Sequence, residues 1–566
     1  MTKPLRGLAV APGLAVGPVF LVESASGEIA AVAGSPDEER ERMHAALDEA
    51  AEEIRELACR VEVELGADEA GIFVAQAAFA SDPALIRMAE DGIAAGESAE
   101  QSVSEAFQVF RRRLQESSSE YLAARAADLD DVRNRVVRVL AGRAAGPEAP
   151  SVPSVIVASE LTPSYTAGLP AQKVVAIATE RGTATSHAAI LARARGIPCV
   201  VGVVGLMTVA RGATHIAVDG TRGRVVPDPD EATRKQFERE ADEASERREE
   251  LRSLRSVAAV TVDGRRVEMA ANVSSLSDLE VAVEVGAEGS GLVRTEFLFQ
   301  DRTEPPSVDE QVDVYRRILE TFPDQRVVFR TLDAGADKPL PFLPRPAEVN
   351  PDLGVRGIRL GLDRPALLED QLRAIIRAGR DSVARVGVMF PMVTTASEID
   401  EVLTVVTRVA ADEDFDTAQM EIGAMVEIPV AALTVGRLAR RLDFVSVGTN
   451  DLLQYLFAAD RRQAQLADLP DLFEPAVLRL LGQLVDDAHS AGAWVGVCGE
   501  SAGTVTGAIA FVGLRCDELS MAPNAIPEVK EALRRLRASD VDHAVRQAMV
   551  APDAVEARQR VQSLLE

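Results

Sequence analysis

The spacing of hydrophobic residues changes along the chain, and each change predicts a different kind of structure. Between Ser35 and Leu140, the residues Leu, Ile, Val and Ala recur at helical spacing among Glu and Arg, as in amphipathic helices. Before and after this segment, short β-branched runs predominate instead. The pattern therefore predicts a helical bundle inserted into an α/β domain.

The predicted α/β domain resumes after a boundary at 141–154 that is rich in Ala, Gly and Pro. Its apolar runs cover residues 154–158, 173–178, 199–203 and 215–218. The segment 227–256 that follows is densely charged, contains no glycine and has helical spacing. It predicts a connecting helix, although an ordinary solvated helix has the same composition.

Short β-branched runs alternate with helical stretches through the C-terminal half of the chain. They lie near 267–271, 291–295, 327–331, 386–392, 422–427, 444–448, 495–498 and 518–521. This alternation predicts a closed (β/α)8 barrel, in which chemistry is found at the C-terminal ends of the strands. We therefore expect a multidomain chain, with an α/β domain from residues 1–20 and 146–226, an inserted α-helical bundle over 21–145, a linker helix over 227–256 and a C-terminal barrel over 257–566.

The charge of the chain restricts its partners. The 61 basic and 89 acidic side chains give a net charge of −28, which argues against nucleic acid as a partner. Residues 21–145 alone carry 26 acidic and 13 basic side chains. Such a surface attracts a basic protein partner, but a solvated acidic surface explains the composition equally well.

The cysteines and the N-terminus indicate a cytoplasmic location. The four cysteines, Cys59, Cys199, Cys498 and Cys516, are too widely spaced for a zinc motif or a disulfide framework. The run 8–22 after Lys3 and Arg6 has the outline of a secretory signal, but its Pro-Gly and Gly-Pro pairs at 12–13 and 17–18 predict strands and turns. No other apolar run is long enough to span a bilayer, so we expect no stable membrane association.

His187 is a candidate nucleophile. It lies in the segment 181–193 (RGTATSHAAILAR), where small residues leave the imidazole exposed and an apolar, basic helical stretch follows. A histidine that attacks phosphorus needs an accessible ring edge and donors for the phosphoryl oxygens, which Thr183, Thr185, Ser186 and a helix N-terminus would supply. The alternative is a capped helix with no chemical role.

Charged residues gather at the predicted strand ends of the barrel. Arg294, Arg330, Arg356 and Arg461 suit an oxyanion-rich substrate, because guanidinium binds phosphate and carboxylate bidentately. Glu427 and Asp451 end successive strands, and two carboxylates completed by water and substrate oxygens form a typical Mg²⁺ site. Asn272, Glu296, Asp333, Asn450 and Glu500 also fall at strand ends. Together these residues predict a site for a phosphorylated carboxylic acid.

Cys498 follows one of the predicted strands, in the sequence Val-Cys-Gly-Glu at 497–500. A lone cysteine is most often a small buried hydrophobic residue. At a strand end it is also a candidate proton donor. The sequence leaves both roles open.

Four segments of the barrel resemble the phosphoenolpyruvate-binding barrel of enzyme I of the bacterial sugar phosphotransferase system. They are 291–298 (GLVRTEFL), 330–338 (RTLDAGADK), 448–455 (GTNDLLQY) and 497–500 (VCGE). The segments 7–17 (GLAVAPGLAVG), 161–164 (LTPS) and 185–187 (TSH) follow the order of the same family. The resemblance thus extends over essentially the whole chain.

The resemblance implies a two-step phosphoryl transfer. Phosphoenolpyruvate would phosphorylate His187 and release pyruvate, and His187 would pass the phosphoryl group to a histidine of a small phosphocarrier protein docked on the helical insert. It also implies a homodimer formed through the barrel. The roles implied for the matching positions are phosphate binding by Arg294 and Arg330, substrate orientation by Arg461 and the loop of Asn450 and Asp451, Mg²⁺ binding by Glu427 and Asp451, added positive charge at the transferring group from Arg356, and protonation of the enolate by Cys498.

The chain departs from the family pattern at three places. Where the family has paired glycines before the histidine loop, this chain has Arg181 and Gly182. Where the family has paired glycines after the third strand, residues 334–336 read Ala-Gly-Ala. Leu453 stands where the family usually has Thr or Ile. These changes slightly reduce backbone freedom but leave every charged position intact.

Two other readings remain. A phosphoenolpyruvate synthase or pyruvate phosphate dikinase shares the histidine domain and the barrel, but it needs an ATP-binding domain, and the first 145 residues are predicted to be helical and contain no glycine-rich phosphate loop. A non-catalytic regulatory paralogue would show decay of the site, and none of the candidate residues is lost.

Overall fold

A computed structural model describes the chain. It covers residues 4–22, 34–65, 67–115, 126–142, 150–162, 165, 169–182, 186, 189, 192–193, 196–300, 302–335, 340–343, 348–460, 463, 465–466 and 469–566. The structure divides into two compact units, Met1–Arg247 and Arg248–Glu566. The finer boundaries predicted above stay predictions.

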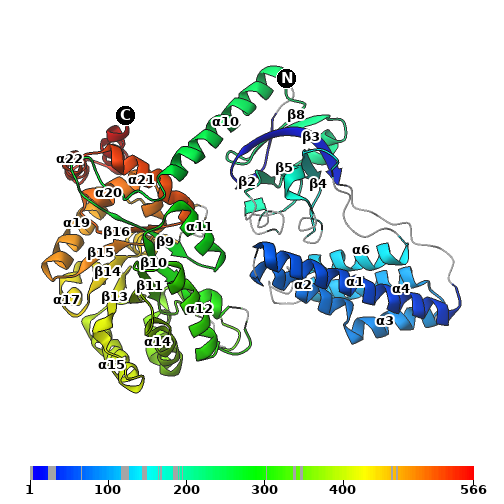
Figure 1. Cartoon of the computed structure of the whole chain (residues 1–566), viewed down its shortest axis with the longest axis horizontal. Coiled ribbons are helices and arrows are strands. Elements are labelled where there is room, and N and C mark those ends of the chain that lie inside the picture. Colours follow the sequence, from blue (N-terminus) through cyan, green and yellow to red (C-terminus); the bar gives the residue numbers. More distant parts are fainter. Residues whose placement is uncertain are drawn as a thin grey trace. The chain divides into compact units, whose positions relative to one another are not determined.

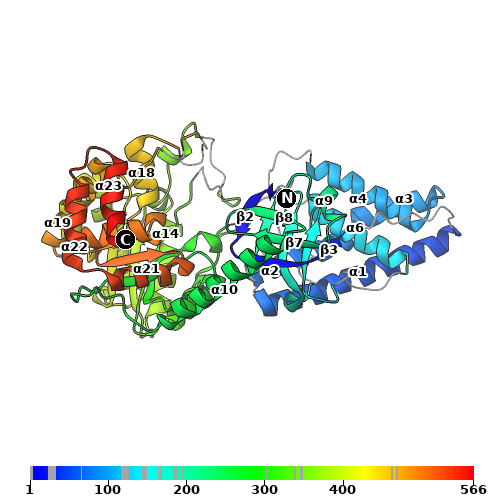
Figure 2. The same ribbon diagram turned by 90° about the horizontal axis from the view of Figure 1, so that it is seen from above.

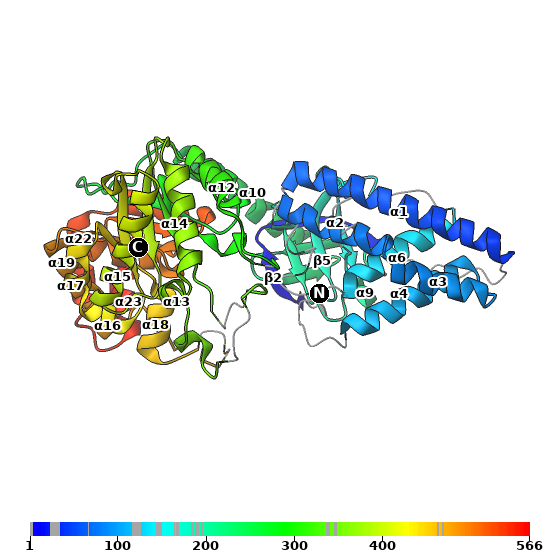
Figure 3. The ribbon, with the colours of Figure 1, turned by 90° about the horizontal axis from the view of Figure 1, so that it is seen from below.

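The first unit contains a bundle of helices with its own core (Figures 1 and 3). Its helices are α1 (Pro36–Leu65), α2 (Ala67–Ala80), α3 (Pro83–Ala94), α4 (Ala99–Gln115) and α6 (Ala126–Leu140). The apolar positions that recur at helical spacing, among them Ile54, Phe73, Phe107 and Val132, are buried together. The predicted helical insert is thus confirmed as a packed bundle.

The first unit also contains an eight-stranded sheet in the order β1-β8-β7-β3-β4-β5-β6-β2. Apolar clusters cover both of its faces, which is why its central strands are apolar at nearly every position. Its strands are β1 (Leu5–Arg6), β2 (Leu8–Ala11), β3 (Leu14–Val22), β4 (Ser154–Ala158), β5 (Val174–Thr179), β6 (Cys199–Val201), β7 (His215–Asp219) and β8 (Arg224–Pro227), and the short helix α9 (Leu206–Ala210) precedes β7.

The prediction that the Gly17-Pro18 pair interrupts the first apolar run is wrong. Both residues lie inside β3, whereas the Pro12-Gly13 pair does separate β2 from β3. Residues Leu14 to Pro18 pair antiparallel with β7, and Val19 begins a parallel pairing with β4. Proline is tolerated here because it lies where the strand exchanges one partner for another.

The charged segment after the sheet forms α10 (Glu231–Ser253). Phe237 in its first half is buried against Ala217 and Val226 of the sheet. The guanidinium of Arg224 lies 5.1 Å from the centre of the Phe237 ring. The beginning of α10 is therefore anchored to the first unit.

The second unit is a closed barrel of eight parallel strands, which confirms the predicted fold class (Figure 1). All eight predicted runs are strands: β9 (Glu268–Val273), β10 (Gly289–Arg294), β11 (Arg326–Arg330), β12 (Arg385–Phe390), β13 (Met420–Val426), β14 (Phe444–Val447), β15 (Trp494–Val497) and β16 (Glu518–Met521). They pair in chain order, and β16 closes the barrel onto β9.

Helices surround the barrel, as views from above and below show (Figures 2 and 3). Their apolar faces pack on the outward side chains of the strands in one large core. They are α11 (Ser277–Val285), α12 (Val308–Thr321), α13 (Ile358–Asp363), α14 (Pro365–Gly379), α15 (Ala396–Asp412), α16 (Pro429–Leu433), α17 (Val435–Leu438), α18 (Thr449–Phe457), α19 (Pro475–Ser490), α20 (Val505–Gly513), α21 (Ile526–Arg535), α22 (Ala538–Ala548) and α23 (Ala554–Gln562).

Side chains fill the interior of the barrel, so the interior is a core and not a channel. Its apolar middle consists of Leu292, Val328, Met389, Met425, Phe444 and Cys498, with Trp494 against them. The N-terminal strand ends contribute the barrel floor, in which Arg326 pairs with Glu268 at 2.8 Å, Glu421 at 3.0 Å and Glu518 at 3.6 Å. The filled interior leaves the C-terminal strand ends as the place for a site.

Within the described ranges, no helix combines the length and hydrophobicity needed to cross a bilayer.

Candidate active site

The barrel brings the candidate residues to one end because parallel strands all finish on the same face. Arg294 and Arg330 are the last residues of β10 and β11. Glu427 follows β13 directly, and Cys498 follows β15. Asn450 and Asp451 lie in the first turn of α18, after β14. The C-terminal face of the barrel therefore carries most of the predicted site.

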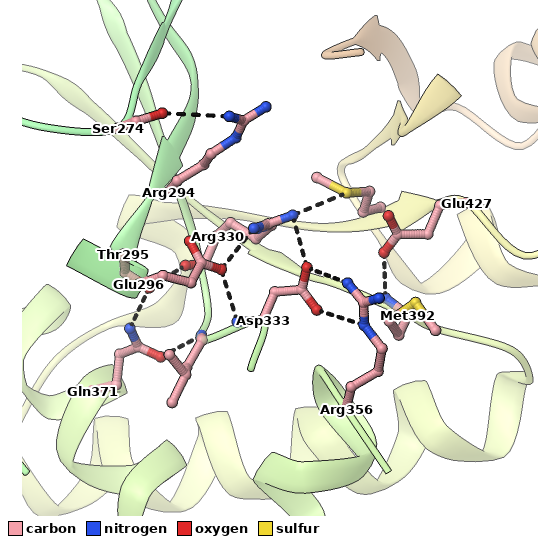
Figure 4. Close-up of polar contacts among 12 residues, drawn as sticks. Ser274, Arg294, Thr295, Glu296, Arg330, Asp333, Arg356, Gln371, Met392 and Glu427 are labelled. Atoms are coloured by element: carbon pink, nitrogen blue, oxygen red, sulfur yellow. Dashed lines mark hydrogen bonds and ion pairs between the residues drawn. The ribbon is translucent and has the colours of Figure 1, made fainter. Parts of the chain in front are cut away.

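Two buried arginines form the centre of the site and share one carboxylate (Figure 4). The Nη1 atom of Arg330 lies 3.2 Å from Asp333 Oδ2. Arg356 donates from Nη2 to Asp333 Oδ2 at 2.9 Å and from Nε to Asp333 Oδ1 at 3.2 Å. Arg330 also donates from Nη2 to Glu296 Oε1 at 2.6 Å. Asp352 Oδ1 also lies 3.5 Å from Arg356 Nη1, so three carboxylates hold the two guanidinium groups in place.

The Arg330 guanidinium stays protonated in this environment. Burial by itself lowers the pKa of Arg330, but attraction to Glu296 and Asp333 outweighs burial and raises the pKa above its ordinary value. A permanently charged guanidinium at a dry site binds a phosphate more strongly than one in water.

Arg294 is held less tightly than the central pair. It is half-buried, and its Nη1 atom lies 3.5 Å from Ser274 Oγ (Figure 4). In the described part of the chain no carboxylate lies within ion-pair distance of it. Its charge is therefore the one most available to a substrate oxyanion.

Glu427 and Asp451 form a buried carboxylate pair. Glu427 is 1 % exposed and accepts a hydrogen bond from the Met392 N–H at 2.6 Å. Burial, followed by the negative charges of Asp451 and Asp333, raises the pKa of Glu427 to about 8. Two buried carboxylates that repel each other in this way favour the binding of a cation.

The backbone around Glu427 is shaped to admit its side chain. A Cβ atom on Gly448 would lie 2.9 Å from Glu427 Oε2 and 3.0 Å from Glu427 Cβ. Among the residues that the structure describes, no group of three or more His, Cys, Asp or Glu side chains is arranged to hold a metal. Glu427 and Asp451 therefore fit Mg²⁺ if water and substrate supply the remaining oxygen ligands.

Asn450 ties two strand-end loops together. Its Nδ2 atom donates to Glu500 Oε1 at 3.2 Å, and its Oδ1 atom accepts the Glu500 N–H at 3.0 Å. This pair of bonds fixes the first turn of α18 against the loop after β15. The position of Asp451 follows from the same turn.

Cys498 lies in the apolar barrel interior, at the end nearest the C-terminal strand ends. It is 2 % exposed, and its N–H donates to the Val447 carbonyl at 3.1 Å. Burial raises the pKa of its thiol to about 11. The thiol is therefore protonated at neutral pH. A protonated thiol is required of a proton donor, but it is also what a cysteine with only a packing role would have.

Two of the predicted site residues, His187 and Arg461, lie outside the described residues, as do Thr183 and Thr185. Their predicted roles stay predictions.

Two residues that hold the site's backbone in place, Gln371 and Tyr455, are not among the residues predicted from the sequence. Gln371 lies on the apolar face of α14 between Leu368 and Leu372, and its only signal is a polar residue at a core position. Tyr455 donates from its hydroxyl to the Asp352 carbonyl at 2.6 Å. The sequence places Glu296 and Asp333 at strand ends but assigns them no role.

The arginines and the carboxylate pair at the strand ends suit a phosphorylated acid as ligand, and family models place the chain in the class of PEP-utilising enzymes. Residues 248–538 match the model for the PEP-binding domain of PEP-utilising enzymes. Residues 6–125 match the N-terminal domain of the same enzymes, and residues 151–223 match their mobile domain.

Curated relatives identify the family within this class. A phosphoenolpyruvate-protein phosphotransferase of Staphylococcus carnosus is 37% identical over 96% of this chain and 95% of its own length. The protein of that name from Streptomyces coelicolor is 40% identical over the full length of both chains. One from Haloferax volcanii is 41% identical over 84% of each chain. The chain therefore belongs to the phosphoenolpyruvate-protein phosphotransferase family.

Proposed function

We propose that this protein transfers the phosphoryl group of phosphoenolpyruvate to His187, releases pyruvate, and then passes the group to a histidine of a small phosphocarrier protein. This is the first step of sugar uptake by the phosphotransferase system. The observation that carries the proposal is the buried pair Arg330 and Arg356 at the same barrel mouth as the carboxylates Glu427 and Asp451. Family membership supplies the substrate and the acceptor.

The arginines bind and orient the substrate. Arg294 and Arg330 bind the phosphate, while Arg356 adds positive charge at the transferring group. Arg461 and the loop of Asn450 orient the substrate. In-line phosphoryl transfer requires little beyond correct positioning and neutralisation of charge, and this constellation is suited to both.

The carboxylates add the metal requirement. Glu427 and Asp451 would hold Mg²⁺, which when bound supplies positive charge to the substrate oxygens. In its absence, burial, followed by repulsion from Asp451 and Asp333, holds the pKa of Glu427 at about 8, so this carboxyl is mostly protonated at physiological pH.

Cys498 completes the formation of pyruvate. When the phosphorus–oxygen bond of phosphoenolpyruvate breaks, the remaining enolate needs a proton on its methylene carbon. The protonated thiol donates it: the S–H bond breaks, a C–H bond forms, and the resulting thiolate takes a proton from water. Cys498→Ala should slow pyruvate formation far more than it slows transfer from phosphorylated His187 to the carrier.

The protein partners follow from the same proposal. The acidic helical bundle is the docking surface for the carrier, and a homodimer forms through the barrel in the cytoplasm. Light scattering of the full chain tests the dimer, and competition by high salt tests the charge-steered docking.

The decisive experiment measures pyruvate release from phosphoenolpyruvate with magnesium, with and without added carrier. His187→Ala should abolish both half-reactions, whereas His215→Ala, a matched control in an exposed position of the same unit, should leave them intact. Acid-labile label from phosphoenolpyruvate that persists on His187→Ala would refute the assignment.

A further inference from the structure

The turn after β11 is supported from behind by a buried amide. Gln371 in α14 is 1 % exposed and lies among apolar residues of the same helix face, including Leu368, Leu372 and Ile375. Burying an amide in such surroundings is unfavourable unless its polar atoms are hydrogen-bonded. The partners of Gln371 therefore indicate why a polar residue occupies this position.

The hydrogen bonds of Gln371 hold the backbone on both sides of Thr331 (Figure 4). Its Oε1 atom accepts the N–H of Leu332 at 2.8 Å. Its Nε2 atom donates to Thr295 Oγ1 at 2.9 Å, and that hydroxyl donates to the Arg330 carbonyl at 3.0 Å. One amide thus restrains the residue before Thr331 through Thr295 and the residue after it directly.

The rest of the network requires an amide and excludes a carboxylate. Gln371 Nε2 also donates to the Tyr315 hydroxyl at 3.1 Å, and that hydroxyl donates to Gln311 Oε1 at 3.2 Å. Both N–H groups and the oxygen of Gln371 are therefore engaged. A glutamate at position 371 would have no N–H for Thr295 or Tyr315.

The restrained turn carries the charges that face the substrate. Arg330 precedes it, and Asp333 ends it. Glu296, next to Thr295 in the chain, accepts both the Arg330 guanidinium at 2.6 Å and the Asp333 N–H at 3.0 Å. The pair Thr295 and Glu296 therefore holds the backbone and the side chain of Arg330 together.

The turn is buried, with Thr331 3 % and Asp333 1 % exposed, but its packing is incomplete on the side of Gln371. A cavity of about 20 Å³ lies beside it, and Thr331, Leu332, Gly357 and Gln371 are among its lining residues. A cavity of this size means that fewer packing contacts restrain the turn on that side. On that side, the hydrogen bonds of Gln371 therefore supply a restraint that packing does not.

We propose that Gln371, acting through Thr295, is a positioning residue that sets the location of the Arg330 guanidinium for phosphoryl transfer. The inference rests on the proposed function. Neither residue touches the substrate; both act by fixing the turn from Arg330 to Asp333. A shift of the guanidinium by about 1 Å is expected to lower the rate about 100-fold.

The test compares full-length variants in pyruvate formation from phosphoenolpyruvate with magnesium, with kcat and KM measured separately. Gln371→Leu and Thr295→Val should each lower kcat/KM about 100-fold, with a fall in kcat that saturating substrate does not restore. Thr295→Ser keeps the hydroxyl and should stay within about twofold of wild type, as expected if the donated hydrogen bond is what matters.

Tyr315→Phe is the matched control. It removes a hydrogen bond from the same buried network without releasing the turn, so it should lower the melting temperature but leave kcat and KM within about twofold of wild type. Wild-type rates in Gln371→Leu or Thr295→Val, or an equal loss of activity in Tyr315→Phe, would overturn the inference. A wild-type protein that forms no pyruvate would instead refute the proposed function itself.

Discussion

Replacing Glu518 by glutamine is expected to make the barrel less sensitive to rising pH. Glu518 begins β16 in the barrel floor and is 1 % exposed. Burial, followed by repulsion from Glu268, raises its pKa from 4.5 to about 8, against the opposing attraction of Arg326. Arg326 faces three carboxylates there, and Arg385 contacts only one of them, Glu268, at 3.6 Å, so the floor favours a protonated Glu518.

The size of the effect follows from linkage between protonation and folding. Because the folded pKa is raised, the folded barrel keeps a proton that the unfolded chain releases above about pH 4.5, and stability falls as pH rises from there to about 8. The wild-type barrel should lose about 2 kcal/mol more of its unfolding free energy between about pH 5 and pH 7 than Glu518→Gln does. Below the unfolded pKa this difference disappears.

Urea unfolding at several pH values measures this difference. The chain has a single tryptophan, Trp494, whose ring stacks on Phe444 at 4.5 Å and lies 4.0 Å from the Arg326 guanidinium, so its fluorescence reports on the barrel floor. Glu280→Gln, at an exposed position of α11, controls for the loss of one charge. Parallel pH curves for wild type and Glu518→Gln would refute the reasoning.

Three further predictions concern the site and the domain junction. Gly448→Ala places a Cβ atom 2.9 Å from Glu427 Oε2. The variant should therefore lower the magnesium-dependent rate of pyruvate formation at least about tenfold and lower the free energy of unfolding by about 1–3 kcal/mol. An unchanged magnesium response would contradict this prediction. Iodoacetamide at neutral pH should modify the exposed thiol of Cys59 in the folded protein. It should modify Cys498 only after unfolding, because burial raises the pKa of that thiol to about 11. Mass spectrometry of the alkylated peptides measures the order of modification. Phe237→Ala should destabilise the first unit by about 3–5 kcal/mol in urea unfolding followed by circular dichroism, while the barrel transition seen by tryptophan fluorescence stays in place.

The hydrophobic pattern alone determined most of the fold. All eight barrel strands were predicted, because a strand buried on both faces needs an almost continuous β-branched run and the helices between such runs need one apolar face. The pattern was wrong at Gly17 and Pro18. A local signal for a turn cannot reveal that β3 exchanges β7 for β4 at that point, which allows a proline inside the strand.

The candidate site was accessible from sequence where position along a strand is sufficient. Arg330, Glu427 and Cys498 could be placed at one end of the barrel because all strands of a parallel barrel finish on the same face. Chemical type then suggested the roles of the arginines and carboxylates. The segment 181–193 made His187 a candidate nucleophile, with a capped helix as the alternative, and family resemblance added its role as acceptor and the carrier.

Only the tertiary structure decided how these charges are held. Asp333 bridges Arg330 and Arg356, although the two arginines lie in different segments of the chain. Gln371, 76 residues from Thr295, meets it only because α14 packs behind the end of β10. Sequence spacing describes neighbours along a helix or a strand. Contacts between elements depend on how those elements pack, and here that packing converts separate charged residues into one preorganised site.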